Sequence, residues 1–257
     1  MTDSPRVIII IEPVGGWFTP WPNVFELSAA LPSDRWILVG GLMVQVHAIA
    51  HDIEAVRPTE DLDVLLHIEL SSTVVTDADR VISALGYVLQ DPVDARRKQS
   101  PHCRYVRDGE LGSEKIDVMV PDHARPPATR RLRGRPMFEV EGGTQALGRT
   151  MTFELEVGAA HSARITVPDE LGALVLKGAA YAADSRDRGR HLQDAAVLAA
   201  CITDHATELR RLGGSDRKRL RSLAQALSDS TNPAWLALTP EQRVAGQDTF
   251  RILTAVN

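Results

Sequence analysis

Residues 57–63 read Arg-Pro-Thr-Glu-Asp-Leu-Asp, and this stretch carries the strongest structural signal in the chain. Asp61 and Asp63 stand one residue apart at the start of an apolar run. Side chains on a β-strand alternate between its two faces, so both carboxylates point the same way and the aliphatic residues take the other face. The stretch therefore predicts a strand over 61–68 with one acidic face and one apolar face.

A strand, a glycine pair and a helix are expected upstream of this stretch. Residues 36–39 form a short β-type run, Gly40 and Gly41 follow it, and residues 42–50 are apolar at helical spacing. A glycine turn that leads into a helix offers backbone N–H groups to phosphate and lets a ligand approach the backbone closely. We therefore expect Gly40 and Gly41 to contact a nucleotide triphosphate.

A third carboxylate is expected on a strand downstream. Residues 103–107 and 115–120 read as two strands joined by a glycine turn, and Asp117 interrupts the apolar alternation of the second. An Asp-x-Asp pair joined by an aspartate from a neighbouring strand is a donor set for Mg²⁺, a hard cation that prefers oxygen ligands. Metal ions held in this way assist transfer of a phosphoryl or nucleotidyl group. The prediction assigns the metal to Asp61, Asp63 and Asp117, with Asp117 also helping to activate the nucleophile.

The rest of the pattern predicts an α+β fold in two domains. A helix is expected over 77–85, and a strand pair over 152–157 and 163–167. We expect a catalytic domain over 1–168, with a mixed sheet and flanking helices as in nucleotidyltransferases, followed by a helical domain over 169–257. The helices predicted after Pro168 lie near 169–183, 190–203, 205–212, 216–228 and 240–255.

Composition indicates an ordinary globular protein. The chain has 257 residues, of which 44% are hydrophobic and 25% charged. The apolar run 7–11 is too short to span a bilayer, and the N-terminus lacks the features of a signal peptide. Cys103 and Cys201 lie far apart without metal-ligand spacing, which favours reduced thiols. We expect a cytoplasmic location and no membrane partner.

Basic residues gather in two segments although the net charge is −5. Residues 125–135 and 210–221 together carry 11 of the 29 Lys and Arg residues. Such patches can attract nucleic acid, and a solvated surface is the alternative for both. In the second segment the inward stripe of the predicted helix is Leu220, Leu223, Ala224 and Leu227.

The glycine pair and the 57–63 stretch together form a motif that resembles a known family. Its elements look like the signature of AbiEii-type nucleotidyltransferases, which belong to the DNA polymerase beta-like nucleotidyltransferase superfamily. Members are known as toxins of type IV toxin–antitoxin and phage-defence systems, and some add nucleotides to tRNA 3′ ends. The matching residues are Gly40-Gly41 and then Arg57-x-Thr59-x-Asp61-x-Asp63.

A second family motif also has counterparts. It consists of a lysine-bearing helix followed by an arginine and by an aspartate that opens the next helix, and here it corresponds to Lys177, Arg186 or Arg190, and Asp194. The chain departs from this motif at Val197, where a second aspartate is usual. The resemblance implies transfer of a nucleoside monophosphate from an NTP to RNA, with tRNA as acceptor, Mg²⁺ or alternatively Mn²⁺ as cofactor, and a separate antitoxin protein as partner.

Lys177 has two interpretations from the residues themselves. It is the only charge between Leu171 and Ala183, so it either snorkels to solvent or meets an anion. We favour a phosphate contact and a catalytic role. Asp194 is expected to orient Lys177 or to act as a base, with a favourable charge at a helix N-terminus as the alternative.

Arg57 and Thr59 are expected to contact a phosphate or a bound sugar, although Arg57 could equally pair with Glu60. His47 and His51 are four residues apart on a predicted helix, but no third ligand for zinc is evident. We therefore reject a zinc site.

Two further functions compete with RNA modification. One is nucleotidylation of a small hydroxylated molecule such as an antibiotic. The other is a catalytically silent nucleotide-binding or antitoxin-like module, against which the intact Asp61, Asp63 and Asp117 argue.

Overall fold

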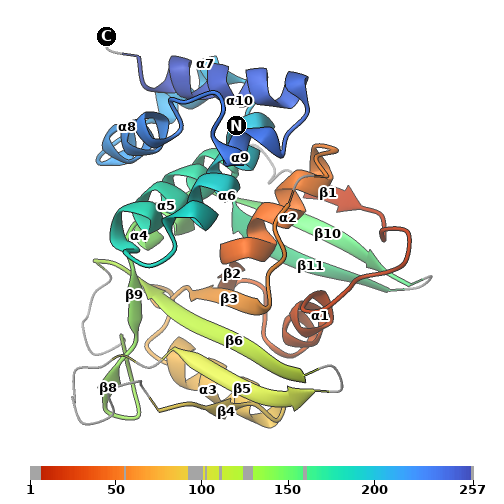
Figure 1. Cartoon of the computed structure of the whole chain (residues 1–257). Coiled ribbons are helices and arrows are strands. Elements are labelled where there is room, and N and C mark those ends of the chain that lie inside the picture. Colours follow the sequence, from red (N-terminus) through yellow and green to blue (C-terminus); the bar gives the residue numbers. More distant parts are fainter. Residues whose placement is uncertain are drawn as a thin grey trace, which may run out of the picture. The chain divides into compact units, whose positions relative to one another are not determined.

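A computed structural model describes residues 7–54, 56–91, 101, 103–109, 112–123, 130–158 and 161–255 (Figure 1). The chain forms two compact units. The sheet unit comprises Met1–Leu42 and Thr59–Val167, and the helical unit comprises Met43–Pro58 and Pro168–Asn257. The predicted division put 43–58 in the first domain, whereas these residues pack with the C-terminal helices.

The main sheet of the sheet unit is mixed, which confirms the predicted α+β class. Strand β3 lies parallel to β6, whereas β2 pairs with β3, β5 with β6 and β4 with β5 in antiparallel fashion. Strand β9 adds a parallel pairing to the end of β6. In spatial order the strands are β2 (Trp36–Leu38), β3 (Asp61–Leu66), β6 (Gly112–Pro121), β5 (Arg104–Gly109) and β4 (Val88–Leu89), with β9 at Phe138–Val140.

The period-two alternation seen in the sequence organises this sheet. Leu62 and Val64 of β3 are fully buried, and so are Ile116 and Val118 of β6. Asp63 and Asp117 lie between these residues and Asp61 precedes Leu62, and all three carboxylates are only partly buried. Burial of one face therefore leaves the acidic positions on the other face.

The sheet unit also contains two longer helices and a second, smaller sheet. Helices α1 (Trp21–Ala30) and α3 (Val74–Ala84) carry apolar faces, and α3 lies behind β5 and β6 in Figure 1. Strands β1 (Val7–Ile10), β10 (Thr150–Val157) and β11 (His161–Pro168) form a three-stranded sheet in which β1 runs parallel to β10. A hairpin of β7 (Arg131–Leu132) and β8 (Arg135–Pro136) and the short helix α4 (Gly143–Leu147) lie between the two sheets in the chain.

The helical unit is built on α5 and α6, which pack against each other. Helix α6 also packs on α9 and α10, and α5 packs on α8. Side chains of Asp169, Asp187, Asp204 and Thr239 accept backbone hydrogen bonds at the starts of α5, α6, α7 and α10. The helices are α5 (Glu170–Ala183), α6 (Arg188–Cys201), α7 (His205–Arg211), α8 (Asp216–Ala226), α9 (Pro233–Leu236) and α10 (Pro240–Leu253).

Helix α2 (Gly40–Ala50) starts in the sheet unit and continues into the helical unit. His47 is fully buried, and its Nε2 lies 2.8 Å from the carbonyl oxygen of Pro168. His51 contacts Glu170 at 3.2 Å. These contacts join 43–58 to the start of α5, far along the chain. None of the helices in the described part of the chain is long and apolar enough to cross a membrane.

Candidate functional site

Strands β3 and β6 bring the three predicted carboxylates together. Their parallel register places Asp63 beside Asp117, and Asp61 beside Lys115. Asp61 and Asp63 share a face of β3, and Asp117 occupies the corresponding face of β6. The pairing of these two strands, which their separate sequence patterns do not specify, is what makes the acids neighbours.

The glycine pair lies directly against residues of the 59–63 stretch. Gly40 has φ of +70°, and a Cβ at this position would come within 1.8 Å of the Asp63 Oδ2. A Cβ on Gly41 would lie 2.8 Å from the Thr59 side chain. Both glycines are therefore required by packing within the protein itself. Contact of Gly40, Gly41 and Thr59 with a nucleotide stays a prediction.

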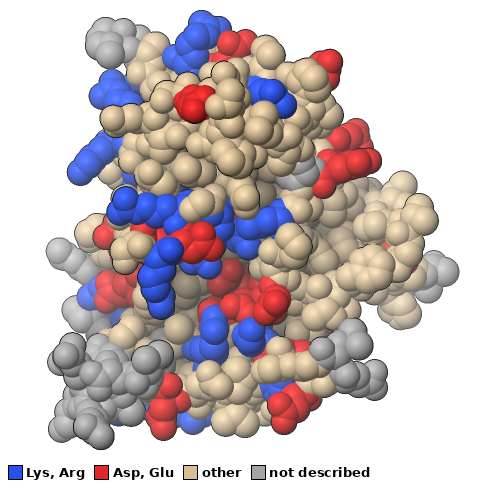
Figure 2. Space-filling view, viewed as in Figure 1, with Lys and Arg blue, Asp and Glu red and all other residues tan. Residues whose placement is uncertain are grey.

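Two basic side chains that the sequence analysis missed complete this site. The Arg104 guanidinium donates from Nε and Nη2 to Asp117, at 2.8 and 2.6 Å, and from Nη2 to Asp61 at 2.8 Å. Lys115 Nζ lies 3.4 Å from Asp61 and 3.3 Å from Glu60. Figure 2 shows acidic side chains over β3 with basic side chains immediately beside them over β6. Lys115 could have been found, since it precedes Asp117 by two residues and shares its face.

The donor set suits a divalent cation, although the carboxylates do not converge on one point. No three Asp, Glu, His or Cys side chains among the described residues form a ready group of metal ligands. Arg104 draws two of the acids onto its guanidinium instead. Oδ1 of Asp61 is buried without a hydrogen bond, and the carboxylate of Asp63 occupies the space that a Gly40 side chain would fill. Carboxylate oxygens are the donors that a hard cation prefers, and Arg104 is hydrogen-bonded to three of them.

A second charged cluster lies within the helical unit. Lys177 Nζ is 2.7 Å from Asp194 Oδ2, and the side chains of the two residues are only 6% and 2% exposed. Arg57 donates to both oxygens of Asp194, at 2.9 and 3.2 Å. Lys177 thus pairs with the Asp194 carboxylate and does not snorkel, and its contact with a phosphate stays a prediction. Arg57 pairs with Asp194 rather than with Glu60. The prediction that Asp194 orients Lys177 agrees with this geometry, while the catalytic roles of both stay predictions.

The ionisation of Asp194 reflects its two cationic partners. Burial raises the pKa of this carboxyl, but the charges of Lys177 and Arg57 outweigh burial and hold the pKa below its ordinary value. Asp194 does not open α6, contrary to the family pattern, because Asp187 caps the helix and Asp194 lies in its second turn. The alternative that Asp194 serves the helix dipole is therefore wrong.

The predicted arginines of the second motif lie around Asp184. Arg190 Nη2 donates to Asp184 Oδ2 at 2.9 Å, and the backbone N–H of Arg186 donates to Oδ1 at 2.8 Å. His191 Nε2 lies 3.2 Å from the same carboxylate. Burial and the charge of Lys177 lower the pKa of His191, so this imidazole is neutral at neutral pH.

The first basic segment lies partly outside the described residues, since Arg125 and its neighbours to 129 are not among them. In the described part, Arg130 pairs with Glu139 at 2.7 Å and Arg133 pairs with Asp79 at 3.0 Å. On α8, Leu220 and Leu223 of the predicted stripe are fully buried, and Leu227, which follows the last residue of the helix, is buried. Ala224 is half-buried. Lys218 and Arg221 are exposed on this helix.

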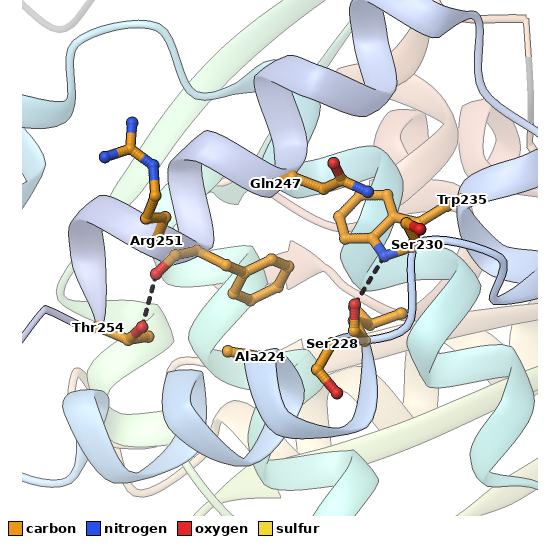
Figure 3. Close-up of a pocket in the computed structure, with 9 residues that line it drawn as sticks. Ala224, Ser228, Ser230, Trp235, Gln247, Arg251 and Thr254 are labelled. Atoms are coloured by element: carbon orange, nitrogen blue, oxygen red, sulfur yellow. Dashed lines mark hydrogen bonds between the residues drawn. The ribbon is translucent and has the colours of Figure 1, made fainter.

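A pocket of about 310 Å³ lies between α8 and α10 in the helical unit (Figure 3). The rings of Trp235 and Phe250 meet edge to face, with their centroids 6.2 Å apart. Trp235 Nε1 donates to the Leu227 carbonyl at 2.8 Å. The pocket lining includes none of the predicted site residues.

The chain has a structural neighbour among solved proteins. No protein-family model and no curated protein matches the chain. A solved structure, the crystal structure of an antigenic nucleotidyltransferase-like protein from Paracoccidioides brasiliensis, is 14% identical, with a TM-score of 0.49. The alignment covers 83% of this chain and 90% of that one.

Proposed function

We propose that this chain is a nucleotidyltransferase that moves a nucleoside monophosphate from an NTP to an acceptor hydroxyl. The observation that carries the proposal is the register of β3 and β6, which sets Asp63 beside Asp117 with Asp61 on the same face. The start of α2 at Gly40 lies against this cluster. Oxygen donors beside a helix N-terminus suit a metal-bound triphosphate.

In this proposal Asp61, Asp63 and Asp117 would hold one or two Mg²⁺ ions, with Mn²⁺ as a substitute. When bound there, the metal would supply positive charge for the triphosphate and make the acceptor hydroxyl easier to deprotonate. Asp117 would accept the proton of the attacking hydroxyl, whose oxygen forms a bond to the α-phosphorus as the bond to the leaving pyrophosphate breaks. The backbone N–H groups at Gly40 and Gly41 orient phosphate oxygens. The proposal also includes Lys177 and Asp194 as residues on which turnover depends.

Labelled NTPs test the reaction. The purified protein, incubated with each of the four α-labelled NTPs, Mg²⁺ and total tRNA, is expected to label an acceptor with at least one nucleotide. Asp63→Asn should abolish labelling because it removes a metal ligand with little change in volume. Labelling by neither protein with any NTP would count against the proposal, and equal labelling by both would remove Asp63 from the mechanism.

RNA, and tRNA in particular, is the acceptor we propose. Support comes from the exposed basic residues of α8, since a cationic helix face attracts the phosphate backbone. Charge reversal of Lys218 and Arg221 is expected to raise the KM for tRNA while leaving the KM for NTP unchanged. Both residues are better targets than Arg130 and Arg133, whose internal ion pairs would be broken by reversal.

A small hydroxylated acceptor such as an antibiotic is the second candidate. It is favoured by the internal pairing of Arg130 and Arg133, which neutralises much of the described part of the first basic segment. Indifference of the KM for tRNA to reversal of Lys218 and Arg221, together with labelling of an aminoglycoside or lincosamide, would favour this candidate.

In the cell, we propose that the chain acts as a toxin that a separate antitoxin protein neutralises. Induced expression of the chain should stop growth, whereas Asp63→Asn should not. Growth inhibition by both proteins would trace the effect to something other than nucleotidyl transfer. A neighbouring gene whose product restores growth would identify the antitoxin.

A further inference from the structure

The further inference concerns Arg104, which lies between two of the proposed metal ligands. Arg104 stands on β5 directly opposite Asp117 on β6. Its guanidinium binds Asp117 through two nitrogens and reaches Asp61 with one of them. A planar fork that engages two carboxylates at 2.6 to 2.8 Å is a geometry that arginine provides and lysine does not.

A divalent cation and this guanidinium compete for the same oxygens. Arg104 uses both oxygens of Asp117 and one of Asp61, which are atoms that a metal would need. Two positive centres at ion-pair distance from the same carboxylates also repel each other. Asp61 Oδ1 is the exception, since it accepts no hydrogen bond and lies 3.4 Å from Lys115 Nζ. A metal at these oxygens therefore competes with Arg104 for its ligands.

We propose that Arg104 is a built-in counter-cation that holds Asp61 and Asp117 until a divalent cation displaces its guanidinium. Arg104 is thus a positioning residue: it keeps neighbouring carboxylates from repelling each other in the metal-free protein and sets the threshold for metal binding. Its side chain is 38% exposed, so the guanidinium has a route to solvent when displaced. The inference rests on the metal site of the proposed function.

The test measures binding of Mn²⁺ to the full-length protein by the electron paramagnetic resonance signal of free Mn²⁺, without nucleotide. Arg104→Met removes the charge and keeps an apolar stem of similar length. We expect it to bind Mn²⁺ about tenfold or more tightly than the wild type, because the competing cation is gone. Addition of Mn²⁺ should raise the Tm of this variant more than that of the wild type.

Arg107→Met is the matched control. Arg107 lies on the same strand, and its guanidinium is also ion-paired with two carboxylates, those of Glu26 and Glu114. Its replacement by Met changes the net charge of the protein by the same amount as Arg104→Met. Its replacement should leave Mn²⁺ affinity within about threefold of the wild type, since long-range charge is screened. Equal gains in both variants would reduce the effect to net charge and overturn the inference. Unchanged or weaker binding by Arg104→Met would assign Arg104 a purely structural role.

A second variant covers a failure of Arg104→Met to fold. Arg104→Lys keeps the charge but cannot bridge both carboxylates. It should therefore bind Mn²⁺ more tightly than the wild type and less tightly than Arg104→Met. Affinity at or below the wild-type level would overturn the inference, as would an absence of binding in all variants. Tighter Mn²⁺ binding without nucleotidyl transfer by the wild type would sustain the inference and reject the proposed function. Transfer without tighter binding would do the reverse.

Discussion

At Gly40 the backbone conformation and the space around it both exclude a side chain. The φ angle of +70° is costly for other residues, and the Asp63 carboxylate fills the Cβ position. We expect Gly40→Ala to push Asp63 out of place, lowering nucleotidyl transfer about 100-fold, a loss typical of small misplacements of catalytic groups. Initial rates and the Mn²⁺ affinity of the variant check this.

Gly134→Ala separates backbone strain from the clash. Gly134 has φ of +78°, close to that of Gly40, but a Cβ there meets nothing within 4 Å. We expect this control to lose about 1 to 3 kcal/mol of stability from strain and to keep its activity. Comparable activity losses in the two variants would show that the contact between Gly40 and Asp63 is unimportant.

The buried His47 predicts a pH dependence of stability. Burial lowers the pKa of this imidazole below 6.5 in the folded protein, so the unfolded chain binds a proton first as the pH falls. The contribution of neutral His47 is thus present above about pH 6.5 and is lost as the pH falls toward the folded pKa. The slope of the unfolding free energy there is up to about 1.4 kcal/mol per pH unit for one such group.

Urea unfolding between pH 7.5 and 5 measures this slope. His47→Gln should flatten it, whereas His161→Gln, at an exposed position, should not. His191 has a pKa lowered in the same direction, so part of the slope should survive in His47→Gln. A slope that His47→Gln leaves intact would contradict the prediction.

Between elements, Asp194 joins α6 to α5 and to the segment before β3. It neutralises two cations, and Lys177 is nearly as buried as Asp194 itself. Asp194→Asn leaves Lys177 charged and buried, which should cost about 3 to 5 kcal/mol. Lys177→Met should cost less, because Asp194 keeps its hydrogen bonds to Arg57. Urea unfolding followed by circular dichroism gives both values. The opposite order would mean that Arg57 does not compensate Asp194.

The helices and strands were easier to predict from the sequence than the pairing between strands. Alternation correctly predicted strands at β3 and β6 with their buried faces, because burial of one face leaves a local signature of period two. The predicted helices after Pro168 also correspond to α5, α6, α7, α8 and α10. Arg104 was missed because its role depends on the register between β5 and β6, which the residues of a single strand do not encode.

Across the whole molecule, the division of the chain was the least predictable feature. Residues 43–58 follow a strand of the sheet unit and precede another, so position in the sequence assigns them to the first domain. Their packing with Pro168 and Glu170 depends on contacts more than 100 residues apart along the chain. The sequence of α2 contains no local pattern that indicates which of the two units its apolar residues pack against.

Hydrogen exchange of the intact protein tests this division. Leu198 of α6 and Leu62 of β3 are both fully buried, so Leu198→Ala and Leu62→Ala should each cost about 2 to 5 kcal/mol in one unit. Because 43–50 packs with the helical unit, Leu198→Ala should speed exchange there together with 170–183. Leu62→Ala should first speed exchange in 61–66. Exchange of 43–50 that follows 61–66 in both variants would place α2 energetically with the sheet.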